Sequence, residues 1–199
     1  WSDPAHRDSS HAVNLYAGTY NVTAIDQNGC TATNTVHVLA PPPIVIDTDV
    51  TGVSCHGAAD GGIVLTVTGG TYPYTYTWPQ LPAVHDSIPI NLAGATYTVI
   101  VADVWTCKDT MLIPVPEPAV LTPLIANTDS VKCFGGNDGL VQLNATGGTA
   151  GYIYNWSNSS TGASISNLPA GNYSVTVQDA NNCTSINSFT VTEPSSIQF

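Results

Sequence analysis

The sequence is poor in charged residues, above all in positively charged ones. Only 9% of its 199 residues are charged, and three cations (Arg7, Lys108 and Lys132) stand against 14 acidic residues, which gives a net charge of −11. A protein that binds nucleic acid needs clustered Lys and Arg side chains to neutralise phosphates. The composition therefore excludes nucleic acid as a partner.

The sequence also lacks any run of 18 apolar residues and any convincing amphipathic helical pattern. A helix that spans a bilayer needs about 20 consecutive apolar residues, so we expect no membrane insertion. The chain begins at Trp1, without a signal peptide, which we interpret as a mature, processed or partial chain. Because 43% of the residues are hydrophobic, with many Val, Ile, Thr and Tyr, we expect packed β-structure rather than disorder.

No set of side chains typical of an enzyme occurs at catalytic spacing. His6-Arg7-Asp8 resembles a kinase catalytic-loop tripeptide, but the Gly-rich loop, the strand Lys and an Asp-Phe-Gly motif are absent. His37, His56 and His85 have no partners at nucleophile or zinc spacing, and no phosphate-binding Gly-x-x-x-x-Gly-Lys occurs. We therefore expect a protein that is not an enzyme and that needs no cofactor.

What the sequence does contain is an internal repeat. Three times, a Leu is followed by a Tyr five residues later, an Asp eleven residues later and a Cys fifteen residues later. The copies begin at Leu15, Leu92 and Leu168 and end at Cys30, Cys107 and Cys183. Chance does not keep three offsets fixed, so this is a repeat protein. The period divides the chain into the C-terminal part of one repeat (residues 1–42) and two complete repeats (43–120 and 121–199).

Each copy carries the period-two pattern of a half-buried strand. Tyr173, Val175 and Val177 alternate with polar residues, and Tyr97 and Tyr20 begin the same pattern in the other copies. About seven short strands per repeat, separated by regular turn signals, indicate an antiparallel β-sandwich. The predicted fold is therefore all-β, with tandem sandwiches of the immunoglobulin or fibronectin III type.

The segment before each of these strands is typical of a corner at which the Tyr hydroxyl bonds to nearby backbone. Gly18 and Gly171 are able to take the positive φ that such a corner would need. In the middle copy Gly94 lies one position early and Ala95 stands in the Gly position, so we expect that corner to differ locally.

A ladder of aromatic residues occurs in both complete repeats. Tyr74, Tyr76 and Trp78 share one parity on a predicted strand, and Trp156 ends the corresponding ladder 78 residues later. The ladder could stack sugars, but its presence in every complete repeat favours a place in the core. We expect structural roles for the recurring large aromatics, namely Trp78, Trp156, Tyr20, Tyr97 and Tyr173.

A calcium site is a weaker hypothesis. Asp47, Asp49, Asp103 and Glu117 could bring oxygen ligands to a junction between repeats. EF-hand spacing is absent, however, and Asp in turns usually accepts hydrogen bonds from local backbone. We therefore do not favour a structural Ca²⁺ site.

The motifs taken together resemble one known repeat. They are Cys-x-Gly-x-x-Asp-Gly, Gly-Gly-Thr, Tyr-x-Tyr-x-Trp, Leu-x-Ala-Gly-x-Tyr and Asp-x-x-x-Cys, and residues 121–199 fit them best. The combination resembles the SprB-type repeat of long surface adhesins of gliding Bacteroidetes and of other large secreted proteins of that phylum. The resemblance implies extracellular stalk modules of a very long protein, exported by the type IX secretion system. A module family specifies an architecture and not a ligand.

The same resemblance raises the question of glycosylation. Bacteroidetes attach O-glycans within an Asp-Ser/Thr-aliphatic pattern, and three matches make Ser87, Thr110 and Ser130 candidate sites. Ordinary strand ends explain the three matches about as well.

Five cysteines in a chain of extracellular type predict disulfides. Cys55 and Cys133 precede the second strand of a repeat, whereas Cys30, Cys107 and Cys183 follow the sixth. In a fibronectin-like sandwich these positions lie at opposite ends of a repeat, about 25 Å apart along a strand, and a disulfide needs Cα atoms within about 7 Å. One scheme therefore pairs Cys55 with Cys183 between repeats and leaves the other three for units beyond this segment. The rival scheme, Cys55–Cys107 and Cys133–Cys183, requires a different strand order.

Two functions remain open. The chain is either a structural or adhesive stalk, whose partners are further copies of the repeat in the same chain or in neighbouring subunits, or a carbohydrate-binding accessory module for surface glycans. A binding module should break the repeat at an exposed aromatic cluster, for which Trp105 is the only candidate, so we favour the stalk. Residues 1–42 lack the first two strands of a sandwich, and we expect more of the same chain or a neighbouring molecule to supply them.

Overall fold

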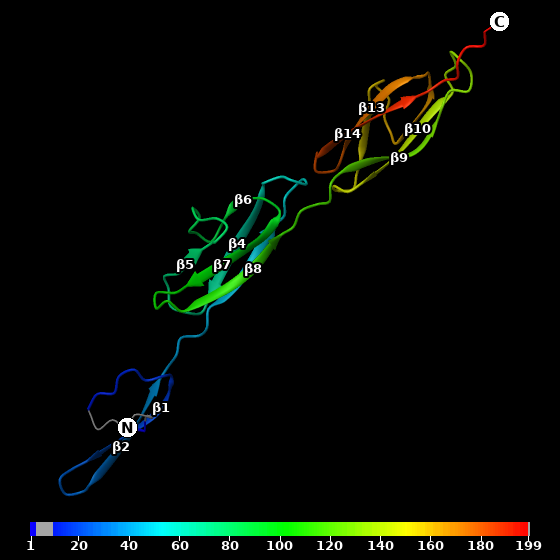
Figure 1. Cartoon of the computed structure of the whole chain (residues 1–199). Helices are drawn as coiled ribbons and strands as arrows, with labels where there is room; N and C mark the ends of the chain where they lie inside the picture. Colours follow the sequence, from blue (N-terminus) through cyan, green and yellow to red (C-terminus); the bar gives the residue numbers. More distant parts are fainter. Residues whose placement is uncertain (3–9, 199) are drawn as a thin grey trace.

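The computed structural model describes residues 1–2 and 10–198, so Arg7 and the His6-Arg7-Asp8 tripeptide lie outside the described residues. The described residues form 14 β-strands and no helix. The strands build three units that follow one another end to end as a rod (Figure 1). Within the described residues, no helix is long and apolar enough to cross a membrane. The predicted all-β fold class is confirmed.

The middle unit is a sandwich of two three-stranded sheets with strand orders β3-β4-β6 and β5-β7-β8, in which every pairing is antiparallel. The first, second and fourth strands of the unit thus form one sheet and the third, fifth and sixth form the other, as in immunoglobulin-type sandwiches. The strands are β3 (Val45–Thr51), β4 (Gly61–Thr68), β5 (Thr75–Thr77), β6 (Ile90–Leu92), β7 (Ala95–Ala102) and β8 (Lys108–Val115).

The third unit repeats this topology, with sheets β12-β10-β9 and β11-β13-β14. Its strands are β9 (Thr122–Asp129), β10 (Gly139–Thr146), β11 (Ile153–Trp156), β12 (Ser164–Leu168), β13 (Gly171–Gln178) and β14 (Thr184–Val191). The sequence predicted about seven strands per repeat, whereas each complete unit has six. The segment after Trp78 makes two successive turns, closed by bonds from Leu81 N to Trp78 O and from Val84 N to Leu81 O, and forms no strand of its own.

Each complete unit has its own hydrophobic core between its two sheets. The cores are built from alternate residues of the strands, and one tryptophan is central to each: Trp78 is 1% exposed and Trp156 is 4% exposed. Fully burying a Val, Leu or Ile side chain contributes about 1.5–3 kcal/mol. The middle core contains Val53, Ile63, Leu65, Trp78, Leu92, Tyr97, Val99, Val101, Ile113 and Val115.

The predicted tyrosine corner is present in all three units. The hydroxyls of Tyr20, Tyr97 and Tyr173 donate to the carbonyl oxygens four residues earlier, at 2.9, 3.1 and 3.0 Å. Two details of the prediction were wrong. The positive φ belongs to the Asn before each Leu and not to the glycines, and the middle corner keeps the same hydrogen bond. Those residues are Asn14, Asn91 and Asn167, with φ of 58°, 56° and 58°, and asparagine tolerates this region better than other non-glycine residues.

The first unit is a hairpin of β1 (Gly18–Ile25) and β2 (Thr31–Val38). These two strands form a two-stranded sheet, and most of their side chains are exposed. Ser2 N donates to Asn21 O at 2.9 Å, which ties the start of the chain to β1.

Candidate functional site at the junction of two units

The turn between β13 and β14 presents Cys183 to the middle unit. Its centre is the buried carboxylate of Asp179, which accepts hydrogen bonds from Asn181 N and Cys183 N, both at 2.9 Å, and from Thr149 N at 2.8 Å. These bonds, first that from Thr149, hold the pKa of Asp179 below its ordinary value of 3.8. Asn182 has a φ of 66°, as expected of a three-residue hairpin loop that ends in the left-handed region. The turn is therefore held in shape before it meets its partner.

The loop between β3 and β4 presents Cys55 from the other side. Asp60 accepts a hydrogen bond from Ser54 N at 2.9 Å, and bonding with Ser54 lowers the pKa of Asp60. Glu117, in the segment that leaves the unit, accepts from Gly57 N at 2.6 Å. Two carboxylates thus hold the loop, one on each side of Cys55.

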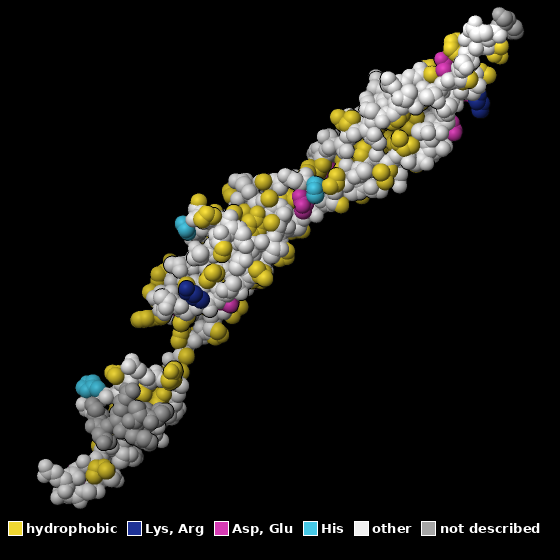
Figure 2. Space-filling model, in the orientation of Figure 1, with side chains coloured by type: hydrophobic (Ala, Val, Ile, Leu, Met, Phe, Trp, Pro, Cys, Tyr) yellow, Lys and Arg dark blue, Asp and Glu magenta, His cyan; other side chains and the backbone are white. Residues whose placement is uncertain are grey.

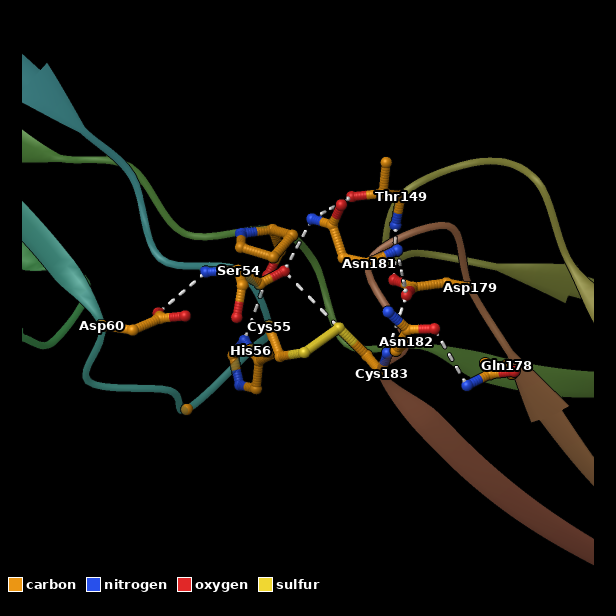
Figure 3. The surroundings of a disulfide bond; sticks show 12 residues. Ser54, Cys55, His56, Asp60, Thr149, Gln178, Asp179, Asn181, Asn182 and Cys183 are labelled. Carbon is orange, nitrogen blue, oxygen red and sulfur yellow. Dashed lines mark hydrogen bonds between the residues drawn. A yellow bond between two sulfur atoms is a disulfide. The ribbon is translucent and has the colours of Figure 1, made fainter.

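The loop and the turn are covalently joined. Cys55 and Cys183 form a disulfide with a Cα–Cα distance of 5.7 Å, across a sequence separation of 128 (Figure 3). Beside it, the side-chain amide of Asn181 donates to Ser54 O at 2.9 Å and to the Thr149 hydroxyl at 3.1 Å. The structure therefore shows the pairing between repeats.

A cavity of about 430 Å³ lies beside the disulfide, and its lining includes His56, Val120 and Ser185 from both units. His56 Nδ1 lies 3.5 Å from a Glu117 carboxylate oxygen and 3.2 Å from Pro118 O. Figure 2 shows His and acidic side chains together at the junction between the middle and third units, on a surface that is otherwise largely uncharged.

The other three cysteines, Cys30, Cys107 and Cys133, are exposed and unpaired among the described residues. The structure does not contain the rival pairs Cys55–Cys107 and Cys133–Cys183. Within one unit, the loop after the first strand and the turn after the fifth lie at opposite ends (Figure 1). The strand order that the sequence predicted keeps these cysteines apart within a unit.

The aromatic ladder lies largely inside the sandwich. Trp78 is buried, and its indole N–H donates to Asp86 O at 3.1 Å. Tyr74 and Tyr76 are half-buried and pack against the core, and the Tyr74 hydroxyl donates to Gly69 O at 2.5 Å. Trp105 lies apart from them and is 72% exposed, in the turn between β7 and β8.

The candidate calcium ligands do not converge. Asp103 is buried and accepts hydrogen bonds from Trp105 N and Cys107 N, and Glu117 caps the Cys55 loop, whereas Asp47 and Asp49 are exposed on β3. In the described part of the chain, no three His, Cys, Asp or Glu side chains are grouped so that they could hold a metal ion.

The three candidate glycosylation residues differ in exposure. Thr110 on β8 is exposed, and so is Ser130, whose hydroxyl lies 2.9 Å from the Thr192 hydroxyl. Ser87 is half-buried.

Sequence reasoning did not assign roles to Ser54, Asn181 or Asp60, and it considered Glu117 only as a candidate calcium ligand. A signal existed for the carboxylates, because Asp60 and Glu117 recur 78 and 76 residues later as Asp138 and Glu193. The signal for Asn181 was weaker, because the first copy carries Asn28 at this position but the middle copy carries Trp105.

Residues 48–81 and 125–161 match the family described as the SprB repeat. The predicted resemblance is confirmed. Both SprB repeat matches begin in the first strand of a unit and include its cysteine-bearing loop.

Similar solved structures include the N-terminal eight immunoglobulin domains of Down syndrome cell adhesion molecule (DSCAM) isoform 1.30.30, with a TM-score of 0.45 and 13% identity over 90% of this chain and 28% of that one. The N-terminal four immunoglobulin domains of Dscam1 isoform 9.44 give a TM-score of 0.37 and 11% identity over 88% of this chain and 54% of that one. These likenesses are too low to bear on function. A comparison with curated proteins gave no match.

Proposed function

We propose that the chain is a structural or adhesive stalk segment of a long secreted cell-surface protein or extracellular filament. The observation that carries the proposal is the Cys55–Cys183 disulfide, which joins two consecutive units at the point where their ends meet. SprB-type repeats are typical of surface adhesins of gliding Bacteroidetes, exported by the type IX system, and a disulfide suits an extracellular place.

The disulfide changes how the rod carries tension. A pull on the two ends enters the middle unit through β3, crosses from Cys55 to Cys183 and leaves the third unit through β14. The residues between the two cysteines lie outside this path, so the chain between them cannot be stretched while the disulfide is intact. A stalk that spaces a tip away from a cell needs this resistance, whereas a binding module does not.

Pulling single chains by their ends tests the proposal. Reduction of the disulfide should add about 420–460 Å of extended chain, at about 3.3–3.6 Å for each of the 128 residues of separation. A Cys55→Ser/Cys183→Ser chain should show the longer extension without reductant, and a Cys107→Ser chain should behave as the parent does. Equal extensions with and without reductant would contradict the load-bearing role.

Surface location and glycosylation are tested on native material. Antibodies against the chain should label intact, unpermeabilised cells. Thr110 and Ser130, the two exposed candidates, should carry sugar if the Asp-Ser/Thr-aliphatic pattern is used. An intact mass equal to that of the bare polypeptide would rule out the glycans.

A further inference from the structure

The loop between β9 and β10 is built like the Cys55 loop but has no partner among the described residues. Asp138 accepts from Lys132 N at 3.0 Å, and Glu193 accepts from Gly135 N at 2.7 Å. The same bonds, at the same positions, hold the Cys55 loop. Cys133 stands in the place of Cys55 and is exposed and unpaired. We refer to residues 132–138 as the Cys133 loop.

The space beside this loop also matches the junction. A cavity of about 550 Å³ there is lined by Cys133, Phe134, Ser195 and Ser196, among others. These four residues correspond in position to Cys55, His56, Ala119 and Val120, which form the middle unit's side of the junction cavity. The third unit thus offers the same surface that receives the Cys183 turn one unit earlier.

The first unit offers the complementary part. In the turn between β1 and β2, Asp26 accepts from Asn28 N at 2.9 Å and from Cys30 N at 2.8 Å, and Gly29 has a φ of 82°. These contacts reproduce two of the three hydrogen bonds that hold the Cys183 turn, with Asn28 in the place of Asn181 and an exposed Cys30 in the place of Cys183. The third bond, from Thr149 N, has no counterpart at Asp26 among the described residues. We refer to residues 26–30 as the Cys30 turn.

The turn at Cys107 has the same frame but not the same contact residue. Asp103 accepts from Trp105 N and Cys107 N, both at 2.9 Å. Trp105 cannot supply the side-chain amide that Asn181 donates to Ser54 O in the junction. The Cys30 turn is therefore the better match to the Cys133 loop.

The Cys30 turn and the Cys133 loop lie at opposite ends of the rod (Figure 1). We infer that the Cys133 loop binds the Cys30 turn of a second copy of the chain, with the Asn28 side chain donating to Lys132 O, and that a Cys133–Cys30 disulfide closes the contact. Such a contact is heterologous and does not close on itself, so repetition extends the rod into a filament. The inference goes beyond the stalk role, because its failure would leave the Cys55–Cys183 disulfide and its load path intact.

The bond needs an oxidant, which a disulfide such as oxidised glutathione supplies. One cysteine thiolate attacks oxidised glutathione, forms a mixed disulfide and releases one reduced glutathione. The other thiolate then attacks the mixed disulfide, forms the Sγ–Sγ bond and releases the second. The two protein thiols together lose two electrons and two protons, and one glutathione disulfide becomes two thiols.

The test uses the full chain in a buffer of reduced and oxidised glutathione, analysed by non-reducing electrophoresis and disulfide peptide mapping. The expected result is a ladder of oligomers whose linking peptide contains Cys133 and Cys30. Cys133→Ser and Cys30→Ser should each abolish this ladder, and Cys107→Ser should keep it. Monomers with glutathione on Cys133, or a statistical mixture that includes Cys30–Cys30 and Cys133–Cys133 dimers, would overturn the inference.

A second readout separates a fitted contact from random collision. Asn28→Ala should lower the yield of the Cys133–Cys30 link about fivefold, the effect of one lost hydrogen bond, and Gln27→Ala, in the same turn, should leave it unchanged. Trp105→Asn should raise the share of Cys133–Cys107 links. If none of the three substitutions changed the yields of the linked products, the exposure of the cysteines alone would decide which of them pair. That result would contradict the inference.

Discussion

The β1–β2 and β13–β14 hairpins are locally alike and differ in what surrounds them. Both have eight paired residues per strand, a corner Tyr bonded four residues back and a turn held by one Asp. Yet Val175 and Val177 are fully buried, whereas the corresponding Val22 is only half-buried and Ala24 is exposed. Cys183 is bonded, whereas Cys30 is exposed and unpaired in the described chain.

In this repeat, nearby residues determine the geometry of the hairpin. Its burial and its disulfide depend instead on the rest of the unit and on a neighbouring unit. Register, corner and turn are formed by residues within one hairpin, so they appear in both. Burial requires the sheet that packs across the sandwich, which β13–β14 has in β9, β10 and β12. The disulfide requires a neighbouring unit with a Cys55-type loop.

Of the changes that test the difference between the two hairpins, removal of the Cys55–Cys183 disulfide should have the largest effect. For a bond that spans 128 residues, chain entropy predicts a contribution of about 5 kcal/mol to the combined free energy of unfolding of the two units. We expect Cys55→Ser/Cys183→Ser to lower the urea midpoint accordingly, while Cys30→Ser leaves it unchanged. A double variant as stable as the parent would show that the disulfide connects the two units but contributes little to their free energy of unfolding.

Truncating one valine in each hairpin should separate burial from local geometry. Val175→Ala leaves a cavity in the third core and should cost about 2 kcal/mol. Val22→Ala, at the same position in β1, should cost well under half of that, because its side chain is only half-buried. Urea unfolding followed by the fluorescence of Trp156 measures the first value, and amide exchange in β1 measures the second. Equal losses would mean that the first hairpin is covered in solution.

The sequence predicted what repeats and could not predict what depends on three-dimensional fit. Fixed offsets placed the corner tyrosines and the turn cysteines, and parity placed Trp78 in the core. The positive φ was wrongly assigned to Gly18 and Gly171, because glycine is the usual residue in this region, whereas the structure places the positive φ at the Asn before each Leu. Asn181 was missed because its partner, Ser54 O, is a backbone atom more than a hundred residues away, which no sequence pattern marks.

Acid should weaken the Cys183 turn in a defined direction. Hydrogen bonds hold the pKa of Asp179 below 3.8, so the stability that its carboxylate contributes is fully present above that pH and is lost as the pH falls through the folded-state value. Asp60 and Asp138, whose pKa values are also lowered, add to the loss in the parent chain. Asp179→Asn should lower the Tm of the third unit at pH 7 and reduce its further fall between pH 4 and pH 2. An unchanged acid dependence would assign the loss to the other carboxylates.

The smallest expected effect concerns the hydrogen bond that Asn181 makes beside the disulfide. The Cys30 turn, with Asn28 at the same position, needs a second molecule to supply the acceptor of such a bond. Asn181 donates to Ser54 O at 2.9 Å and is exposed, so its loss should cost about 1 kcal/mol or less. The equilibrium constant for forming Cys55–Cys183 against a glutathione buffer measures it directly, because the bond helps to align the two thiols. Asn181→Ala should lower this constant about three- to fivefold, without a change in the Tm of the separately folded cores. Asn28→Ala, at the same position in the first hairpin, is the matched control and should leave the constant unchanged. If both variants left it unchanged, the rigid Asp179 turn alone would align Cys183, and the Asn at this position would matter only for the choice of partner.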